Sequence, residues 1–141
     1  MIGRTLAVDY GLKRTGLAVC DALGIAAHPI EAIVSRSLEI TVAAIIDVVK
    51  EREVQRVVVG MPYLPDGREG EQVKNVFVFL DALRAKLPEG YPLTHQDERH
   101  TTKEARVLLR ETGLRGKKAK AKLDSVAATV ILRQFLQEHA D

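Results

Sequence analysis

Residues 4–21 read RTLAVDYGLKRTGLAVCD, two apolar runs joined by a short polar turn at residues 11–13. Runs of Val, Leu and Ala on either side of so short a turn predict two β-strands paired as a hairpin. The segment HPIEAIV, residues 28–34, predicts a third strand. The chain is therefore expected to open with three consecutive strands, the first of which ends at Asp9.

Beyond this opening, predicted helices alternate with strands. Apolar residues recur at helical spacing after Ser37, a predicted N-cap, and this pattern fades around residues 51–53. The run QRVVVG predicts a strand buried on both faces, and the Pro and Gly residues of MPYLPDGREG indicate a loop. Four further elements are expected: a second helix with Val73, Val76, Phe77, Leu80, Leu83 and Leu87 on one face; a fifth strand, PLTHQDE; a helix opened by a Thr101–Glu104 capping box and ended at Gly113; and a final helix from Leu123.

This order of elements predicts the fold class. Antiparallel strands can share a tight turn, whereas parallel strands need a crossover of about a dozen residues, here a helix. We therefore expect an α/β fold with a five-stranded mixed sheet and helices on both faces. A chain of 141 residues, 46% of them hydrophobic, is of a size that forms one domain, here residues 1–141.

Basic residues are concentrated late in the chain. From Arg99 to Lys122 there are nine Lys or Arg residues and two acidic ones, a local net charge of +7 that leaves −5 for the rest. Such polarisation favours a surface that binds nucleic acid, because Lys and Arg contacts to phosphate supply most non-specific affinity. A solvated loop that only keeps the protein soluble is the alternative. Within this basic region, the stretch GLRGKKAKAK, residues 113–122, is expected to form a mobile loop.

Other compositional features indicate where the protein works. No apolar run approaches the roughly 20 residues that cross a bilayer, and no signal peptide is recognisable, so a cytoplasmic location is expected. The one cysteine, Cys20, lies in an apolar run and is predicted to be a core thiol.

Three acidic residues are expected near one edge of the sheet. Asp9 ends the first strand, Glu98 or its neighbour Asp97 ends the fifth, and Asp124 lies early in the final helix. Ligands and substrates bind at the carboxyl ends of parallel strands, and carboxylates without His or Cys favour a hard ion, Mg²⁺ or Mn²⁺. Each acid also has a purely structural explanation, as a turn acid, an ion-pair partner or a favourable charge near a helix N-terminus. Spacing alone does not choose between Asp97 and Glu98.

Several other polar residues are weaker candidates. Asp21 is expected on the order of 20 Å from Asp9 at the far end of the hairpin, and should be structural. His95 and His100 lack an orienting partner in the sequence, and Ser125 lacks the glycine-rich elbow of an activated nucleophile.

Four motifs give the chain a resemblance to a known family. VDYGLKRTGLAVCD, VVVGMPYLPDGREG, DERHTTKEA and KLDSVAATVILRQFL occur in order and span nearly the whole sequence. Together they resemble the YqgF family, also called RuvX-like, of pre-16S rRNA nucleases and Holliday junction resolvases.

The resemblance implies a ribonuclease-H-like fold and an acid triad of Asp9, Glu98 and Asp124, which favours Glu98 over Asp97. It also implies that Gly60 and Pro62 form a GxP loop. Two positions depart from the family pattern: His100 replaces a usually apolar residue, and the loop at residues 63–65 is less polar than expected. The residues expected to contact nucleic acid are Gly11, Lys13, Arg14, Arg99, Thr101, Lys103, Arg115, Lys117, Lys118 and Lys120.

We therefore expect an endonuclease that uses Mg²⁺ or Mn²⁺ on structured RNA, in maturation of the 5′ end of pre-16S rRNA. The nearest alternative is a Holliday junction resolvase acting on branched DNA, which would need two active sites and hence a homodimer; the sequence leaves monomer and homodimer open. Two alternatives come from other classes. One is a nucleotide-binding protein whose DxG loop would be residues 9–11, and the other is a non-catalytic RNA-binding module.

Overall fold

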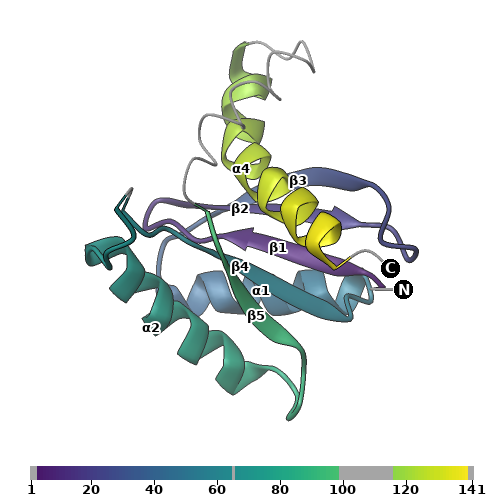
Figure 1. Ribbon diagram of the computed structural model, residues 1–141, viewed down its shortest axis with the longest axis horizontal. Helices are drawn as coiled ribbons and strands as arrows, with labels where there is room; N and C mark the ends of the chain where they lie inside the picture. The colour runs from purple at the N-terminus through teal and green to yellow at the C-terminus, as the bar shows by residue number, and fades with distance from the viewer. Residues whose placement is uncertain (1–2, 65, 99–115, 140–141) are drawn as a thin grey trace.

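The protein forms one five-stranded sheet with helices against both faces (Figure 1). The computed structural model describes residues 3–64, 66–98 and 116–139, and for residues 116–124 the backbone alone. In chain order the elements are β1 (Thr5–Asp9), β2 (Arg14–Cys20), β3 (Ala27–Val34), α1 (Leu38–Glu51), β4 (Arg56–Met61), α2 (Glu71–Lys86), β5 (Leu93–Asp97) and α4 (Gly116–Glu138).

The strands are ordered β3-β2-β1-β4-β5 across the sheet. The pairs β1–β2 and β2–β3 are antiparallel, whereas β4 is parallel to both β1 and β5. The opening strands therefore form the predicted meander, and the helices α1 and α2 are the crossovers that parallel pairing requires. The predicted fold class, an α/β mixed sheet with helices on both faces, is confirmed.

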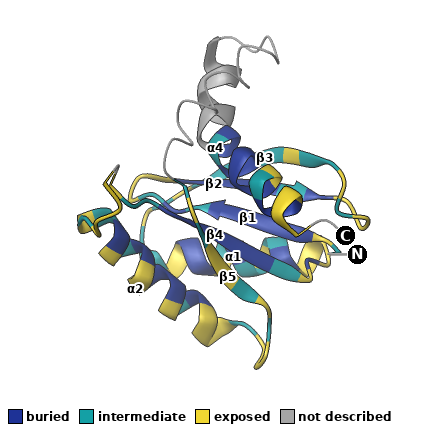
Figure 2. Ribbon diagram, in the orientation of Figure 1, coloured by how far each residue is buried: buried dark blue, intermediate teal, exposed yellow. Residues whose placement is uncertain are grey.

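Helices α1 and α2 cover one face of the sheet (Figure 1). Ser37 is the N-cap of α1, as predicted, and its hydroxyl accepts a hydrogen bond from the Ile40 amide at 3.1 Å. The large side chains of the central strands, among them Leu6 and Val8 of β1, point into this layer. Figure 2 shows the buried residues running along the central strands and the inner sides of both helices.

Helix α4 covers the opposite face, and small side chains bring it close to the sheet. Ala7 and Ala18 alternate with the large residues of their strands and meet Ala128 and Ile131 of the helix in a fully buried cluster. The small side chain of Ala128 therefore lets the helix lie close to the sheet. Two layers with different side-chain sizes follow from the two-residue periodicity of the strands.

The prediction that Phe77 lies on the buried face of α2 is wrong. Phe77 is 38% exposed, whereas Phe79 is fully buried and stacks on Tyr10, with ring centroids 4.3 Å apart. The buried stripe of α2 runs through Val73, Val76 and Phe79, three residues apart each time, so Phe77 falls on its flank. Because Tyr10 directly follows Asp9, this stack also holds the end of β1.

The basic stretch at residues 113–122 is not the loop that was predicted. Its residues from Gly116 onward belong to α4, whose first turns extend beyond the sheet (Figure 1). Ala and Lys are good helix formers, and these turns lack the large apolar residues that would have marked them as helical in the sequence. Asp124 is consequently the ninth residue of its helix rather than one near its start.

Some sequence predictions fall outside what the structure tests. The helix predicted from Thr101 to Gly113 lies outside the described residues. The assignment of residues 1–141 to a single domain stays a prediction. Among the described residues, no helix combines the length and apolar character needed to cross a membrane.

The two phenylalanines of α2 provide a matched test of the core. Phe79→Ala should lower the free energy of unfolding by about 3–5 kcal/mol, because it empties a closed site and removes the Tyr10 stack. Phe77→Ala should cost less than about 1 kcal/mol, because its ring is already partly in solvent. Urea unfolding followed by circular dichroism measures both changes, and equal losses would contradict this view of the α2 layer.

Candidate active site

Three parallel strands end at the same edge of the sheet. Asp9 is the last residue of β1, Met61 is the last of β4, and Met61 pairs with Asp97 at the end of β5. The chain leaves β5 with Glu98, whose amide donates to the Met61 carbonyl at 3.0 Å. This backbone bond extends the ladder by one residue, so Glu98 is held across β4 from Asp9, with one strand between them.

The carboxyl groups of Asp9 and Glu98 lie within hydrogen-bonding distance of each other. Burial raises the pKa of Glu98 to about 9, and the charge of Asp9, their shared hydrogen bond and the charge of Asp97 all act in the same direction. Two carboxylates this close cannot both stay ionised without a cation, and a hydrogen bond between them requires one proton. Without a bound cation, the raised pKa of Glu98 therefore means that the pair holds one proton at neutral pH.

Gly60 makes room for this pair. A Cβ added to Gly60 would lie 2.9 Å from the carboxyl carbon of Glu98 and 2.5 Å from the Cδ1 atom of Ile131. Both distances are shorter than side-chain contacts allow, so a larger residue would push Glu98 or the α4 layer away. The glycine of the predicted GxP loop is therefore explained by steric contact with the candidate site.

Asp124, the third predicted acid, is described only through the backbone of α4. Whether its carboxylate joins Asp9 and Glu98 therefore stays a prediction. Among the described side chains, to which that of Asp124 does not belong, no three His, Cys, Asp or Glu residues form a metal site.

The turn between β1 and β2 borders the acidic pair and carries three predicted nucleic-acid contacts. Lys13 and Arg14 are exposed, while Gly11 is partly buried. A Cβ on Gly11 would lie 2.4 Å from the Arg14 carbonyl oxygen, so the turn itself requires glycine at this position. A role for Gly11 in admitting a phosphate stays a prediction beside this local explanation.

The remaining predicted contacts cannot be placed in the same way. Arg99, Thr101, Lys103 and Arg115 lie outside the described residues, as does His100. Lys117, Lys118 and Lys120 lie on the first turns of α4, on a helix where a loop had been expected. Their contacts with nucleic acid stay predictions.

Several residues have the structural roles expected from the sequence. Asp21 sits at the far end of β2, where its carboxylate accepts from the Ile25 amide at 2.9 Å, and hydrogen bonds from backbone amides lower its pKa. The buried Cys20 thiol accepts from the Thr5 amide. His95 is exposed and meets the edge of the Phe77 ring.

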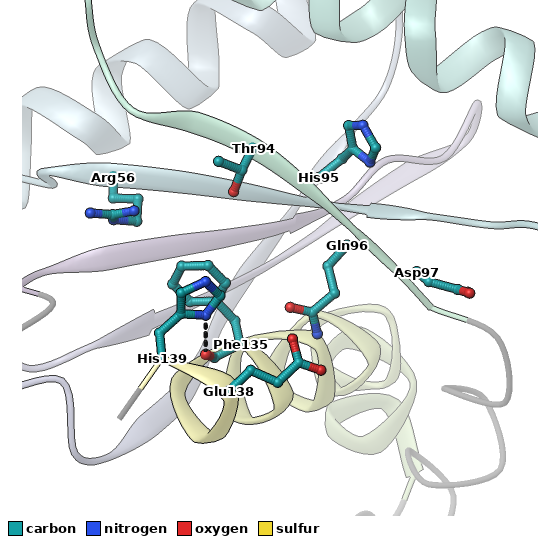
Figure 3. Close-up of a pocket in the computed structure, with 8 residues that line it drawn as sticks. All are labelled: Arg56, Thr94, His95, Gln96, Asp97, Phe135, Glu138 and His139. Carbon is teal, nitrogen blue, oxygen red and sulfur yellow. Dashed lines mark hydrogen bonds between the residues drawn. The ribbon is translucent and has the colours of Figure 1, made fainter. Parts of the chain in front are cut away.

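A pocket of about 340 Å³ lies between β5 and the C-terminal half of α4 (Figure 3). The Arg56 guanidinium lies 5.9 Å from the centre of the Phe135 ring, and His139 stacks on that ring at 4.2 Å. Neither Asp9 nor Glu98 lines this pocket. It is therefore separate from the acidic pair, although Asp97, which lines the pocket, directly precedes Glu98 in the chain.

Two contributions to the site were missed from the sequence. The effect of Asp97 on the pKa of Glu98 follows only from their positions at the end of β5. Ser125, considered only as a nucleophile, is fully buried and bonds to backbone atoms of β2 and β3. No pattern in the sequence signals contacts between residues 95 and 108 positions apart.

Solved structures share this architecture. RuvC of Thermus thermophilus, solved in complex with a Holliday junction, has a TM-score of 0.61 at 19% identity, covering 98% of this chain and 96% of its own. The fowlpox virus resolvase, solved with junction DNA, has a TM-score of 0.59 at 11% identity, covering 98% and 99%. At these identities the likeness concerns the fold alone, and it confirms the predicted ribonuclease-H-like class.

Sequence relatives are much closer. Residues 3–138 match the model of the family described as "RuvX: Holliday junction resolvase", and the chain belongs to this family. A protein of Syntrophus aciditrophicus named "Putative pre-16S rRNA nuclease" is 38% identical over 94% of this chain and 87% of its own length. A protein of Chloroflexus aurantiacus with the same name is 40% identical over 93% and 84%. The predicted class of enzyme, a nuclease, is confirmed by these relatives.

Gly60→Ala tests the steric space beneath Glu98. The added methyl group should displace the Glu98 carboxyl and cost about 1–3 kcal/mol of stability from overpacking. If the pair is catalytic, cleavage should fall by much more than this loss of stability explains, while the substrate KM changes little. A suitable control is Gly70→Ala, whose Cβ would lie 3.3 Å from the flexible end of Leu64. Full cleavage by folded Gly60→Ala protein would contradict the steric requirement.

The raised pKa of Glu98 predicts how stability depends on pH in EDTA. Between the ordinary value of 4.5 and about 9, the folded protein holds a proton that the unfolded chain has released. The free energy of unfolding should therefore fall as pH rises through this window, by on the order of 4 kcal/mol between pH 5 and pH 8. Glu98→Gln should remove this slope, whereas Glu51→Gln, at an exposed position, should keep it. Urea unfolding across the pH range measures both variants. The same pH dependence of stability in both would contradict the assignment of the raised pKa to Glu98.

Proposed function

We propose that this protein is a divalent-metal-dependent endonuclease that hydrolyses phosphodiesters of structured RNA, in maturation of the 5′ end of pre-16S rRNA. Asp9, Glu98 and Asp124 are the proposed ligands of Mg²⁺ or Mn²⁺. The observation that carries the proposal is the pair of acids held together at the carboxyl edge of the sheet. A cytoplasmic location is part of the same proposal.

The acidic pair fits a hard cation in its chemistry. Its donors are carboxylate oxygens, which Mg²⁺ and Mn²⁺ prefer, and the strand ends hold them at hydrogen-bonding distance. The proton between them marks a place where positive charge is stabilised. A divalent ion would take over that role, and Glu98 would release its proton as the ion binds.

The chemistry follows from this arrangement. A bound divalent ion can lower the pKa of a water and stabilise the leaving oxygen of a phosphodiester. The chain supplies the carboxylates and keeps their backbones fixed through the β1–β4–β5 ladder. It also has a glycine, Gly60, at the position where a larger residue would displace Glu98. Lys13 and Arg14 of the neighbouring turn would hold the phosphates on one side, with Gly11 in the same turn.

The basic residues after Glu98 would bind the rest of the substrate. Phosphate contacts are proposed for Arg99, Lys103, Arg115 and three lysines of α4, with a hydrogen bond from Thr101. Since α4 extends beyond the sheet in Figure 1, its Lys117, Lys118 and Lys120 follow a helix rather than a flexible loop. We propose that these lysines contribute phosphate contacts, the sequence-independent part of nucleic-acid binding.

The choice between RNA and DNA rests on the relatives. The names of the close relatives refer to pre-16S rRNA, which supports an RNA substrate. The family description refers to Holliday junctions, which keeps a branched-DNA substrate as the second candidate. The second candidate requires a homodimer with two sites, whereas RNA cleavage needs a single site.

Substitution of the acids tests the catalytic proposal. Asp9→Asn, Glu98→Gln and Asp124→Asn should each lower Mn²⁺-dependent cleavage of a pre-rRNA leader by about 100-fold or more, because each removes a charged ligand. Asp97→Asn is the matched control, since this neighbour acts on Glu98 only through its charge, and it should lose far less. Unchanged cleavage by Asp9→Asn would favour a non-catalytic RNA-binding module.

A comparison of substrates separates the remaining candidates. A pre-rRNA leader, a four-way junction and a plain duplex are incubated with Mg²⁺ or Mn²⁺, and the solution mass is measured with and without the junction. Preferential cleavage of the leader supports the proposal. Preferential cleavage of the junction by a dimer supports the resolvase, and ATP binding without cleavage would point to the DxG type of nucleotide-binding protein.

A further inference from the structure

The ladder between β2 and β3 is interrupted beside the acidic edge. Thr15 pairs with Ile33, but two residues further along β2 the partner of Leu17 is Ile30, three residues back along β3. Strand β3 therefore carries one extra residue opposite Gly16. Such a bulge opens the ladder locally and leaves backbone groups in need of other partners.

The hydroxyl of Ser125 fills this interruption. Its oxygen accepts from the Leu17 amide at 3.3 Å and donates to the Ile30 carbonyl at 2.5 Å, and the side chain is fully buried. Leu17 and Ile30 are cross-strand partners. One side chain of α4 therefore takes the place of a backbone hydrogen bond between two strands.

This contact lies next to the candidate active site in the register of the sheet. Leu17 also pairs with Val8 on β1, and the adjacent pair is Gly16 with Asp9. Further along α4, Phe135 lies beside Arg56 at the beginning of β4. The helix therefore runs from the acidic edge toward the opposite edge, and residue 124 precedes Ser125 on the side of Asp9.

We propose that Ser125 is a positioning residue that fixes α4, and with it Asp124, relative to the Asp9–Glu98 pair. This inference rests on the proposed function, in which Asp124 is the third metal ligand. A hydroxyl bonded to two strands sets both the height and the rotation of the helix. The apolar contacts of Ala128 and Ile131 hold the helix on the sheet but are non-directional.

Another buried hydroxyl of α4 provides a control. Thr129 is 2% exposed and one turn further along, and its hydroxyl donates to the Ser125 carbonyl within the same helix. Thr129→Val keeps the shape of the side chain and removes one hydrogen bond. That bond lies within α4 and does not involve the strands. A structural effect common to buried hydroxyls would appear equally in Ser125→Ala and Thr129→Val.

The first measurement is the affinity of the RNA-free protein for Mn²⁺, which electron paramagnetic resonance detects. Ser125→Ala should weaken Mn²⁺ binding by about tenfold, as for residues that orient metal ligands, and Thr129→Val should leave it unchanged. Cleavage at saturating Mn²⁺ should show a lower kcat with an unchanged KM for RNA. Ser125→Cys, which keeps a weak donor and acceptor, should lie between wild type and Ser125→Ala, and it carries the test if Ser125→Ala does not fold.

A double-mutant cycle shows whether Ser125 acts through Asp124. In an Asp124→Asn background, adding Ser125→Ala should cause no further loss of Mn²⁺ affinity. The same tenfold loss in both backgrounds would overturn the inference, and so would equal effects of Ser125→Ala and Thr129→Val. If instead Asp124→Asn binds Mn²⁺ as tightly as wild type, the proposed ligand set fails, and this result is distinct from failure of the positioning role.

Discussion

Parallel pairing of β1, β4 and β5 fixes where the two acids stand before their side chains make any contact. Asp9 and Glu98 repel each other when ionised, and side chains free to move would separate. They stay together because their backbones belong to one ladder, including the bond from the Glu98 amide to the Met61 carbonyl. The folding energy of the sheet thus holds an arrangement that electrostatics alone would disperse.

The fold was predictable because its signals are local. The hairpin turn, the apolar run of β4 and the Ser37 cap each occupy a few consecutive residues, and their order leaves few possible topologies. It was harder to predict which of Phe77 and Phe79 is buried. Residues 76–80 are all apolar, so the sequence leaves the centre of the buried face of α2 ambiguous. The start of α4 was missed because the sequence of its first turns lacks the large apolar residues that mark a helix.

The site was predictable only in part. Asp9 and Glu98 could be assigned to one edge because strand ends converge there, and the resemblance selected Glu98 from its neighbour. The raised pKa of Glu98 could not be foreseen, since it depends on burial and on the separation of the carboxyl groups. The same holds for Ser125, whose partners are contributed by two other elements of the sheet.

Strand β5 lies at the border of the sheet and has β4 as its only neighbour in the strand order. The register of its five paired residues, from Leu93 to Asp97, together with the Glu98–Met61 backbone bond, determines which side chain lies beside Asp9. A slip of one residue would bring Asp97 to that place, and its side chain is one methylene shorter. The slip would also turn all the side chains of β5 to the opposite face of the sheet. The separation of the two acids is therefore only as well defined as the alignment of a strand at the border of the sheet.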